Sequence, residues 1–242
     1  MKCLIIAAGR GWRLRTRTDS KPLYPVLGVP LIERVMRSAA DGGATGFVVV
    51  TGYNGPAVRA HLDAFAERSG LPVAHVVNEQ WELSNGLSVL KAQEVLPEPF
   101  LLSMSDHLFD PRTVAALLAA PPAPGETVLA VDYDLANPLV DLDDVTRVAV
   151  TDGRIGRVGK GLDAYDAYDT GLFYATPALF DAIEQAIATT GDASLSGGMN
   201  VLAAAGRARA FDVEGRFWMD VDGPAEADLA ERVLRERLGV HP

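Results

Sequence analysis

The sequence has one cysteine and no long apolar run. The single thiol, on Cys3, cannot form an internal disulfide, and this favours a reducing compartment. The N-terminal apolar run covers only residues 3–8, which is too short for a signal-peptide core. No other stretch approaches the roughly 18 continuous apolar residues of a membrane span. We therefore expect a cytoplasmic protein that does not insert into a membrane.

Basic residues and histidines are also scarce. Lys and Arg number 22 against 32 Asp and Glu, and the net charge is −10. A chain this acidic is a poor ligand for nucleic acid, which requires a basic face. The four histidines are scattered, and none of them, including His107, has further His or Cys at zinc-ligand spacing. The segment "LSMSDH" lacks the GxSxG pattern of a serine nucleophile.

The order of apolar runs predicts an α/β fold. In the first half, short strand-like runs alternate with helix-like segments, which is typical of βαβ units and a mainly parallel sheet. The expected strands are 3–8, 46–52, 72–78 and 99–106, and the expected helices are 30–43, 55–70, 85–96 and 110–120. Asp110 should cap the last of these helices, with Pro111 at its first position.

The second half is richer in strands and has fewer helices. Strand-like runs cover 126–134, 146–159 and 169–175, and Asp152-Gly153 within them indicates a hairpin. Helices return at about 177–190, 195–205 and 223–238. We expect one Rossmann-like domain over 1–242, a three-layer sandwich whose mainly parallel mixed sheet has an antiparallel C-terminal extension. Residues 1–110 would be its first half, which looks like a nucleotide-type α/β unit, and 111–242 its second half.

A basic loop follows the first strand, in "LIIAAGRGWRLRTRTDSKPLYPVLGVPLI" (4–32). Leu14 stands where a dinucleotide-binding fingerprint needs its third glycine, which disfavours a dehydrogenase, and no GK pair forms a phosphate loop. A longer loop that wraps a triphosphate fits better, with charge from Arg13 and Lys21. Arg15 and Arg17 are equally well explained as solvated loop residues.

Acidic residues that suit Mg²⁺ stand at two places. Asp106 comes just past a buried strand, where ligands of α/β sheets bind, and Asp220 and Asp222 precede the last helix. Side chains two apart on extended backbone point to one side. We favour Asp222 as the direct ligand and Asp220 as its support, although Asp222 beside Gly223-Pro224 also reads as a helix cap.

The loop motif resembles the signature AAGxGxRL…KPLxPV of the nucleotidyltransferases that make activated sugars and alcohols, whose fold is GT-A-like. The resemblance implies that Gly9, Arg10 and Gly11 wrap the phosphates of a nucleoside triphosphate, within a nucleotide site that includes Ala7, Ala8 and Ser105. It implies that Arg13 and Lys21 stabilise charge on the transferred phosphate and on departing pyrophosphate. It also implies a metal held by one aspartate after the fourth strand and another near the C-terminal end.

The segment "GRVGKGLDAYDAYDTGLFYA" carries the acceptor prediction. It resembles the GKxL…DTGxF element of inositol-1-phosphate cytidylyltransferases, and "MSDHLFDP" and "NEQWELSNGLSVLKA" also resemble that subgroup. The resemblance implies transfer of a cytidylyl group from CTP to inositol 1-phosphate, giving CDP-inositol and pyrophosphate. Lys160 would act on the acceptor phosphate, with Asp166, Asp169 and Gly171 around it, and the product could pass to a separate membrane-bound synthase.

Base recognition is assigned to Thr51, at the end of the second strand, and to Asn85, Gly86 and Ser88, which also read as a helix cap with a tight turn. Several alternatives stay open. Phosphocholine, a phosphonate or another small alcohol or sugar phosphate could replace inositol 1-phosphate. A choline site would need an aromatic cage, for which the sequence offers Trp12, Trp81, Tyr168 and Trp218. A nucleotide-binding module without catalysis is a different class, which the intact charged set argues against.

Overall fold

The computed structural model describes residues 1–239. Within these residues the strands are β1 (Lys2–Ala7), β2 (Pro25–Val26), β3 (Val29–Pro30), β4 (Gly46–Thr51), β5 (Val73–Val77), β6 (Phe100–Met104), β7 (His107–Phe109), β8 (Thr127–Asp132), β9 (Arg147–Thr151), β10 (Arg154–Gly159), β11 (Ala167–Ala175), β12 (Ala208–Asp212) and β13 (Trp218–Asp220). Nine of them form one mixed sheet in the order β5-β4-β1-β6-β11-β8-β12-β10-β9. β7 pairs with β13, and β2 with β3, in separate two-stranded ribbons.

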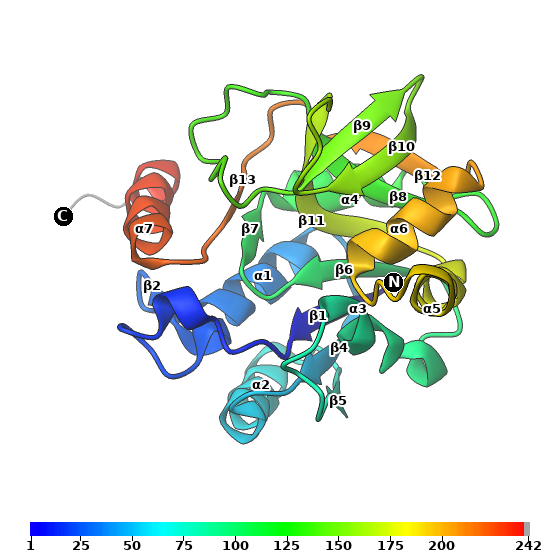
Figure 1. The fold of residues 1–242 in the computed structure, drawn as a ribbon. Helices are drawn as coiled ribbons and strands as arrows, with labels where there is room; N and C mark the ends of the chain where they lie inside the picture. Colours follow the sequence, from blue (N-terminus) through cyan, green and yellow to red (C-terminus); the bar gives the residue numbers. More distant parts are fainter. Residues whose placement is uncertain (240–242) are drawn as a thin grey trace.

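Helices cover both faces of this sheet (Figure 1). They are α1 (Leu31–Asp41), α2 (Gly55–Ser69), α3 (Asn85–Leu90), α4 (Pro111–Leu118), α5 (Ala178–Thr190), α6 (Leu195–Ala204) and α7 (Pro224–Leu238), with the short 3₁₀ turns η1 (Trp12–Leu14), η2 (Lys21–Leu23) and η3 (Gln93–Val95). Buried residues of α1, α2, α4 and α7 form one core with the sheet, and those of α3, α5 and α6 form the other. None of the helices described is both long and apolar enough to cross a membrane.

The parallel half of the sheet explains the apolar runs of the first half of the sequence. β1 lies between β4 and β6 and is parallel to both, so that Leu4 pairs with Val48 on one side and Leu102 on the other. Successive side chains of β1 enter opposite cores, with Ile5 in one and Leu4 and Ile6 in the other. Cys3 is fully buried, and burial raises the pKa of its thiol to about 12, as expected for a core residue.

The structure confirms the predicted hairpin at Asp152-Gly153 and the predicted helix cap at Asp110. Asp152 and Gly153 have φ of 50° and 74° and connect β9 to β10, as an Asp-Gly hairpin requires. The carboxylate of Asp110 accepts a hydrogen bond from the backbone N–H of Arg112, and Pro111 begins α4. The predicted antiparallel extension is present, because β11 runs antiparallel to both β6 and β8.

Five strands and one helix end differ from the sequence prediction. β2 and β3 have only two residues each and lie in the segment between β1 and α1. β7 and β13 have three residues each, too few to show a periodicity, and β12 has the sequence ARAFD, which lacks β-branched residues. The helix expected over 85–96 stops as α3 at Leu90 and continues only as the 3₁₀ turn η3. Pro97 disfavours helical backbone at Leu96, whose φ of −126° and ψ of 66° end the turn.

Candidate active site

A small β-ribbon joins the C-terminal segment to the end of the central sheet. β7 continues from β6 and pairs antiparallel with β13, so that His107 lies opposite Asp220. The backbone N–H of Val221 also donates to the carbonyl oxygen of Asp106 at 3.0 Å. This ribbon brings Asp222 to Asp106, although the two are far apart in the sequence.

Lys21 lies between these two aspartates. Its side chain is buried, and its Nζ contacts Asp106 Oδ2 and Asp222 Oδ1. Burial alone would lower the pKa of Lys21, but the charges and hydrogen bonds of the two carboxylates outweigh it and raise that pKa. Burial would likewise raise the pKa of Asp106, but Lys21 and His107 lower it well below its usual range. The ammonium and the Asp106 carboxylate therefore both stay charged at neutral pH.

The loop after β1 has a conformation that allows this contact. Gly11 has φ of 68°, and a Cβ built on it would collide with Cβ of Lys21. Lys21 itself begins η2, with Pro22 next in the turn. Further along, the guanidinium of Arg34 donates to the carbonyl oxygen of Val26 at 2.6 Å and 2.9 Å, which ties the end of the loop to α1.

Arg13 links the same site to a second carboxylate group. Its Nη2 lies 2.8 Å from Asp222 Oδ2 and 2.5 Å from Asp144 Oδ2, and its Nη1 lies 3.8 Å from Asp141 Oδ2. Asp144 also contacts Nζ of Lys160 through its Oδ1. Arg13, predicted at the triphosphate, and Lys160, predicted at the acceptor, are therefore joined through one carboxylate.

His107 is a third cationic group beside the aspartates. Its Nδ1 lies 2.8 Å from Asp106 Oδ1. Burial would lower the pKa of His107, but the hydrogen bond and charge of Asp106, with Asp220 and Asp222 also contributing, raise it to about 9. Gly171, with φ of 73°, packs against the His107 ring, and a Cβ there would collide with ring atom Cδ2. Gly171 thus makes room for the imidazole.

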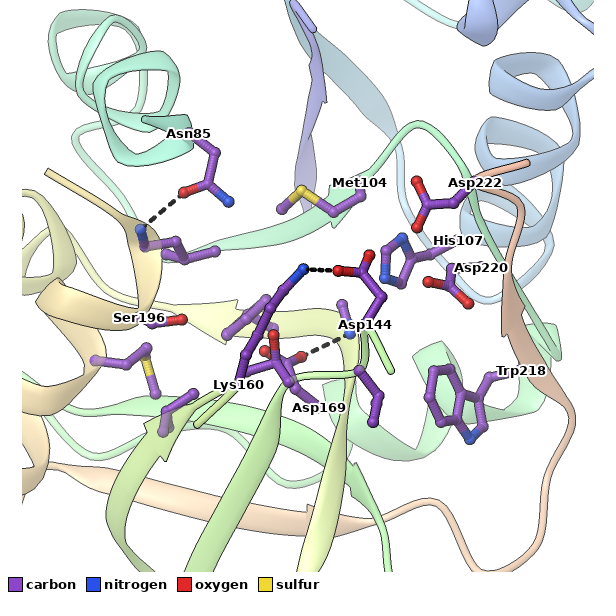
Figure 2. A pocket seen from close by; sticks show the side chains of 17 residues that line it. Asn85, Met104, His107, Asp144, Lys160, Asp169, Ser196, Trp218, Asp220 and Asp222 are labelled. Carbon is purple, nitrogen blue, oxygen red and sulfur yellow. Dashed lines mark hydrogen bonds and ion pairs between the residues drawn. The ribbon is translucent and has the colours of Figure 1, made fainter. Parts of the chain in front are cut away.

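A cavity of about 180 Å³ opens beside these groups. Figure 2 shows His107, Asp220 and Asp222 at one end of it, Asn85 at the other, and the Lys160–Asp144 pair between them. The lining residues are Asn85, Met104, His107, Asp144, Val145, Thr146, Val158, Lys160, Asp169, Gly171, Phe173, Leu195, Ser196, Met199, Trp218, Asp220 and Asp222.

Asp169 is a fourth carboxyl in the cavity wall, beside Asp144, Asp220 and Asp222. Its Oδ1 accepts a hydrogen bond from the backbone N–H of Gly171 at 2.7 Å. Burial raises the pKa of Asp169 to about 6, against the lowering effects of this hydrogen bond and of His107. Burial also raises the pKa of Asp220 to about 6, helped by Asp222 and Asp106 and opposed by His107.

We expect Asp169→Asn to stabilise the fold at pH 8. A carboxyl whose folded-state pKa lies above its unfolded value adds stability that is full below the unfolded pKa and is lost as pH rises through the folded pKa. The wild type should therefore lose up to about 3 kcal/mol between pH 4 and pH 8, given the change from 3.8 to about 6. Asparagine keeps the Oδ1 acceptor and has no charge to bury. Urea unfolding at pH 8 and pH 5 should show an advantage of the variant that narrows at pH 5, and an equal advantage at both would contradict the assignment.

The loop that is predicted to wrap the triphosphate follows β1. Ala7 and Ala8 are buried, whereas Gly9 and Arg10 are exposed. The guanidinium of Arg10 lies 4.0 Å from the ring centre of Trp12 and 4.9 Å from that of Tyr53. These aromatic contacts hold the exposed Arg10 beside Trp12 and Tyr53.

Three residues predicted in the nucleotide site are buried in the protein. Ser105 is buried, and its backbone N–H donates to Ile6. Thr51 is buried, with its hydroxyl accepting from Arg59, and the hydroxyl of Ser88 accepts from Asn78. Both side chains thus already have partners inside the protein.

Asn85 and Gly86 begin α3 and face α6. Asn85 lines the cavity, and its Oδ1 accepts from the backbone N–H of Leu195 at 2.9 Å. A Cβ on Gly86 would collide with the carbonyl oxygen of Ala193. Gly86 therefore allows close approach of two segments, and Asn85 alone of this pair reaches the cavity.

Asp166 is the predicted acceptor residue that the structure does not bring to the site. It is exposed, it does not line the cavity, and its Oδ2 accepts from the backbone N–H of Val150 at 2.7 Å. It serves the pairing of β9 with the start of β11. The prediction for Asp166 depends on its closeness to Asp169 in the sequence. Because β11 begins between the two residues, their side chains lie in different places.

Asp144 and His107 contribute more than the sequence suggested. Asp144 lies in the connection between β8 and β9, in the acidic segment "DLDD", which looks like a solvated turn. For His107 the sequence suggests only a zinc-ligand role. Within residues 1–239 no group of three or more His, Cys, Asp or Glu side chains is arranged to hold a metal ion.

Comparisons with known proteins identify the family to which this chain is similar. The family profile described as a MobA-like NTP transferase domain matches residues 3–208. A protein named bifunctional IPC transferase and DIPP synthase from Rubrobacter xylanophilus is 37% identical over 95% of this chain and 51% of its own length, and one of the same name from Aquifex aeolicus is 30% identical over 96% and 51%. This chain spans about half the length of these relatives.

A solved structure supports the same grouping. The inositol-1-phosphate CTP transferase from T. maritima superposes with a TM-score of 0.84 and 27% identity, over 100% of this chain and 98% of that one. The α/β nucleotidyltransferase fold expected from the sequence is therefore confirmed. With its Gly9–Lys21 loop at the end of β1 and a profile match over most of its length, this chain belongs to the MobA-like NTP transferase family.

Proposed function

We propose that this protein transfers a cytidylyl group from CTP to the phosphate of inositol 1-phosphate, giving CDP-inositol and pyrophosphate. The observation that carries the proposal is the buried Lys21, held between Asp106 and Asp222 next to a cavity that Lys160 and Asp169 line. Cations and carboxylates that converge in this way suit a phosphoryl-transfer reaction, in which negative charge builds up on phosphate oxygens. The names of the relatives and of the superposed structure support the choice of CTP and of the inositol phosphate.

The reaction that this site suits needs no activated protein nucleophile. An oxygen of the acceptor phosphate attacks the α-phosphorus of CTP, a new P–O–P bond forms, and the bond to the departing pyrophosphate breaks. The attacking oxygen is already anionic at neutral pH, so that no general base has to remove a proton. Catalysis then rests on positioning and on charge stabilisation by Arg13 and Lys21, both of which contact Asp222.

The two substrates would occupy the two sides of the Lys21 site. The nucleotide phosphates would lie along the loop from Gly9 to Arg13, whose exposed glycine backbone offers N–H groups. The acceptor would lie in the cavity, with its phosphate at Lys160 and its hydroxyls toward Asp169. Asn85, at the far end of the cavity, would complete the polar wall.

The carboxylates fit a Mg²⁺ ion. Asp106 and Asp222 already converge on one cation, the ammonium of Lys21, and Mg²⁺ typically takes one or two carboxylates together with waters and substrate phosphates. We propose Asp106 and Asp222 as its ligands, with Asp220 in support. When bound, the ion would neutralise the charge of the triphosphate.

We expect Asp106→Asn to weaken divalent-metal binding at least about tenfold and to raise the Mg²⁺ concentration needed for turnover. A neutral amide is a poorer ligand for a hard cation than a carboxylate. Electron paramagnetic resonance of Mn²⁺ titrated into the protein with CTP measures this without turnover. The exposed Asp163 provides the control, since Asp163→Asn removes the same charge from a loop outside the cavity. Equal Mn²⁺ affinity in the Asp106 variant and the wild type would remove Asp106 from the metal site.

A screen for pyrophosphate release tests the proposed function as a whole. CTP, UTP, ATP and GTP are each paired with inositol 1-phosphate, glucose 1-phosphate, phosphocholine and a small aminoalkyl phosphonate. The proposal predicts release with CTP and inositol 1-phosphate well above all other pairs. Release with another acceptor would keep the transferase class and replace the substrate, and no release with any pair would favour a binding module.

The proposed product would be the substrate of a second enzyme. The relatives' names join an IPC transferase to a DIPP synthase, and we propose that the CDP-alcohol made here passes to a membrane-bound synthase. The cytoplasmic location and the division into a nucleotide half and an acceptor half stay predictions.

A further inference from the structure

Asp144 contacts two cationic side chains that the proposed reaction needs for phosphate. Its Oδ2 lies 2.5 Å from Arg13 Nη2, and its Oδ1 contacts Lys160 Nζ. Arg13 comes from η1, in the loop after β1, whereas Lys160 follows β10. Asp144 lines the cavity wall, where Figure 2 shows its pair with Lys160.

We propose that the Asp144 carboxylate takes the place of the acceptor phosphate in the empty site, and that the phosphate displaces it on binding. The inference rests on the proposed function, which it deepens by locating the acceptor phosphate between Arg13 and Lys160. Asp144 then acts as an internal competitor that lowers the affinity for phosphorylated acceptors.

The chemistry of the two groups supports the exchange. Carboxylate and phosphate both present anionic oxygens to N–H donors, and a guanidinium binds either one through its fork of donors. The position between Arg13 and Lys160 also adjoins the reacting centre, since Arg13 Nη2 lies 2.8 Å from Asp222. An acceptor phosphate placed there would lie next to the nucleotide phosphates, as attack requires.

Asp144 is able to leave this position without rearrangement of the fold. Its side chain is 27% exposed, and those of Arg13 and Lys160 are 48% and 59% exposed. The next residue, Val145, is buried, and its N–H bonds to the carbonyl of Asp141, which anchors the backbone while the Asp144 side chain rotates. Burial would raise the pKa of Asp144, but Lys160 and Arg13 lower it, so that an anion leaves and not a neutral acid.

Phosphate binding by matched variants tests the inference. Inorganic phosphate is titrated calorimetrically into the wild type, Asp144→Asn and Asp143→Asn, the last removing one charge from an exposed neighbour. The two partly exposed ion pairs of Asp144 should lower the affinity for phosphate about three- to tenfold. The Asp144→Asn variant should therefore bind phosphate more tightly by that factor. Asp143→Asn should match the wild type. Adding Lys160→Ala to Asp144→Asn should abolish the gain, which assigns the bound phosphate to this position.

The opposite results are equally clear. Phosphate binding by Asp144→Asn that equals or falls below that of the wild type would overturn the inference, and Asp144→Ser repeats the test if the asparagine variant does not fold. In turnover, Asp144→Asn should lower KM for inositol 1-phosphate and leave kcat within a few-fold, whereas a purely structural residue would lower kcat. The phosphate titration does not depend on CTP or on turnover. A chain that is inactive with inositol 1-phosphate would therefore contradict the proposed function, while the titration would still test whether Asp144 competes with phosphate.

Discussion

Replacing Lys21 by alanine is expected to lower kcat by about 10²–10³-fold, the scale seen when one preorganised group that stabilises transition-state charge is removed. Lys21 is a buried cation that joins the loop after β1 to the two aspartates, and it contacts Asp106 and Asp222. As the bond to pyrophosphate breaks, negative charge grows on the departing oxygens. A fixed ammonium near that position stabilises the transition state more than the substrates, so the loss should fall on kcat more than on KM.

The structure adds an effect on stability. Without Lys21, Asp106 keeps His107 and Asp222 keeps Arg13 as counter-charges, so the loss of stability should stay below the roughly 3 kcal/mol that breaking a fully buried ion pair costs. Turnover is therefore measured at saturating Mg²⁺ and below the melting temperature of the variant. Lys91→Ala is the control, since Lys91 is exposed at the end of α3. A folded Lys21→Ala enzyme with kcat within a few-fold of the wild type would show that Lys21 has no role in the chemistry.

The positions of Lys21 and Asp106 in the site could be predicted from local features of the sequence. Buried parallel strands appear as short apolar runs, and ligands bind beyond their carboxyl ends. Asp106, directly after such a run, and Lys21, in the loop after β1, could therefore be assigned to one edge of the sheet, where they are in contact. The αL turn at Asp152-Gly153 and the cap at Asp110 depend on single residues and were equally accessible.

The positions of Asp222, Asp144 and Asp169 depend on long-range pairings that a single sequence does not show. The short β7–β13 ribbon, which brings Asp222 to Asp106, has no periodicity of its own. Asp144 meets Arg13 and Lys160 only because the connection after β8 returns to the end of β10. Asp166 and Asp169 look equivalent in the sequence, but one accepts a backbone hydrogen bond from β9 and the other faces the cavity.

The second large effect concerns the choice of acceptor. We expect kcat/KM for inositol 1-phosphate to exceed that for phosphocholine at least about a hundredfold. The cavity presents the carboxyl of Asp169 and the amide of Asn85, which suit the hydroxyls of a polyol. Phosphocholine has no hydroxyl, and a buried polar group left without its partner discriminates strongly against the ligand that lacks it.

The aromatic residues support the same direction of selectivity. A quaternary ammonium binds best in a cage of several aromatic rings. Of the four aromatic residues that the sequence offered for a cage, Trp218 alone lines the cavity. Trp12 is 57% exposed at the nucleotide loop, Trp81 packs against Tyr53, and the hydroxyl of the buried Tyr168 donates to the carbonyl oxygen of Leu135.

Direct competition between the two acceptors tests the central claim. The protein is incubated with CTP, Mg²⁺ and equal concentrations of inositol 1-phosphate and phosphocholine, and the diphosphate products are resolved by ³¹P nuclear magnetic resonance. Lys21→Ala serves as the matched catalyst control. Our account predicts CDP-inositol in at least about a hundredfold excess over CDP-choline, with little product from the variant. Equal amounts of the two products, or an excess of CDP-choline, would contradict the assignment of this site to inositol 1-phosphate.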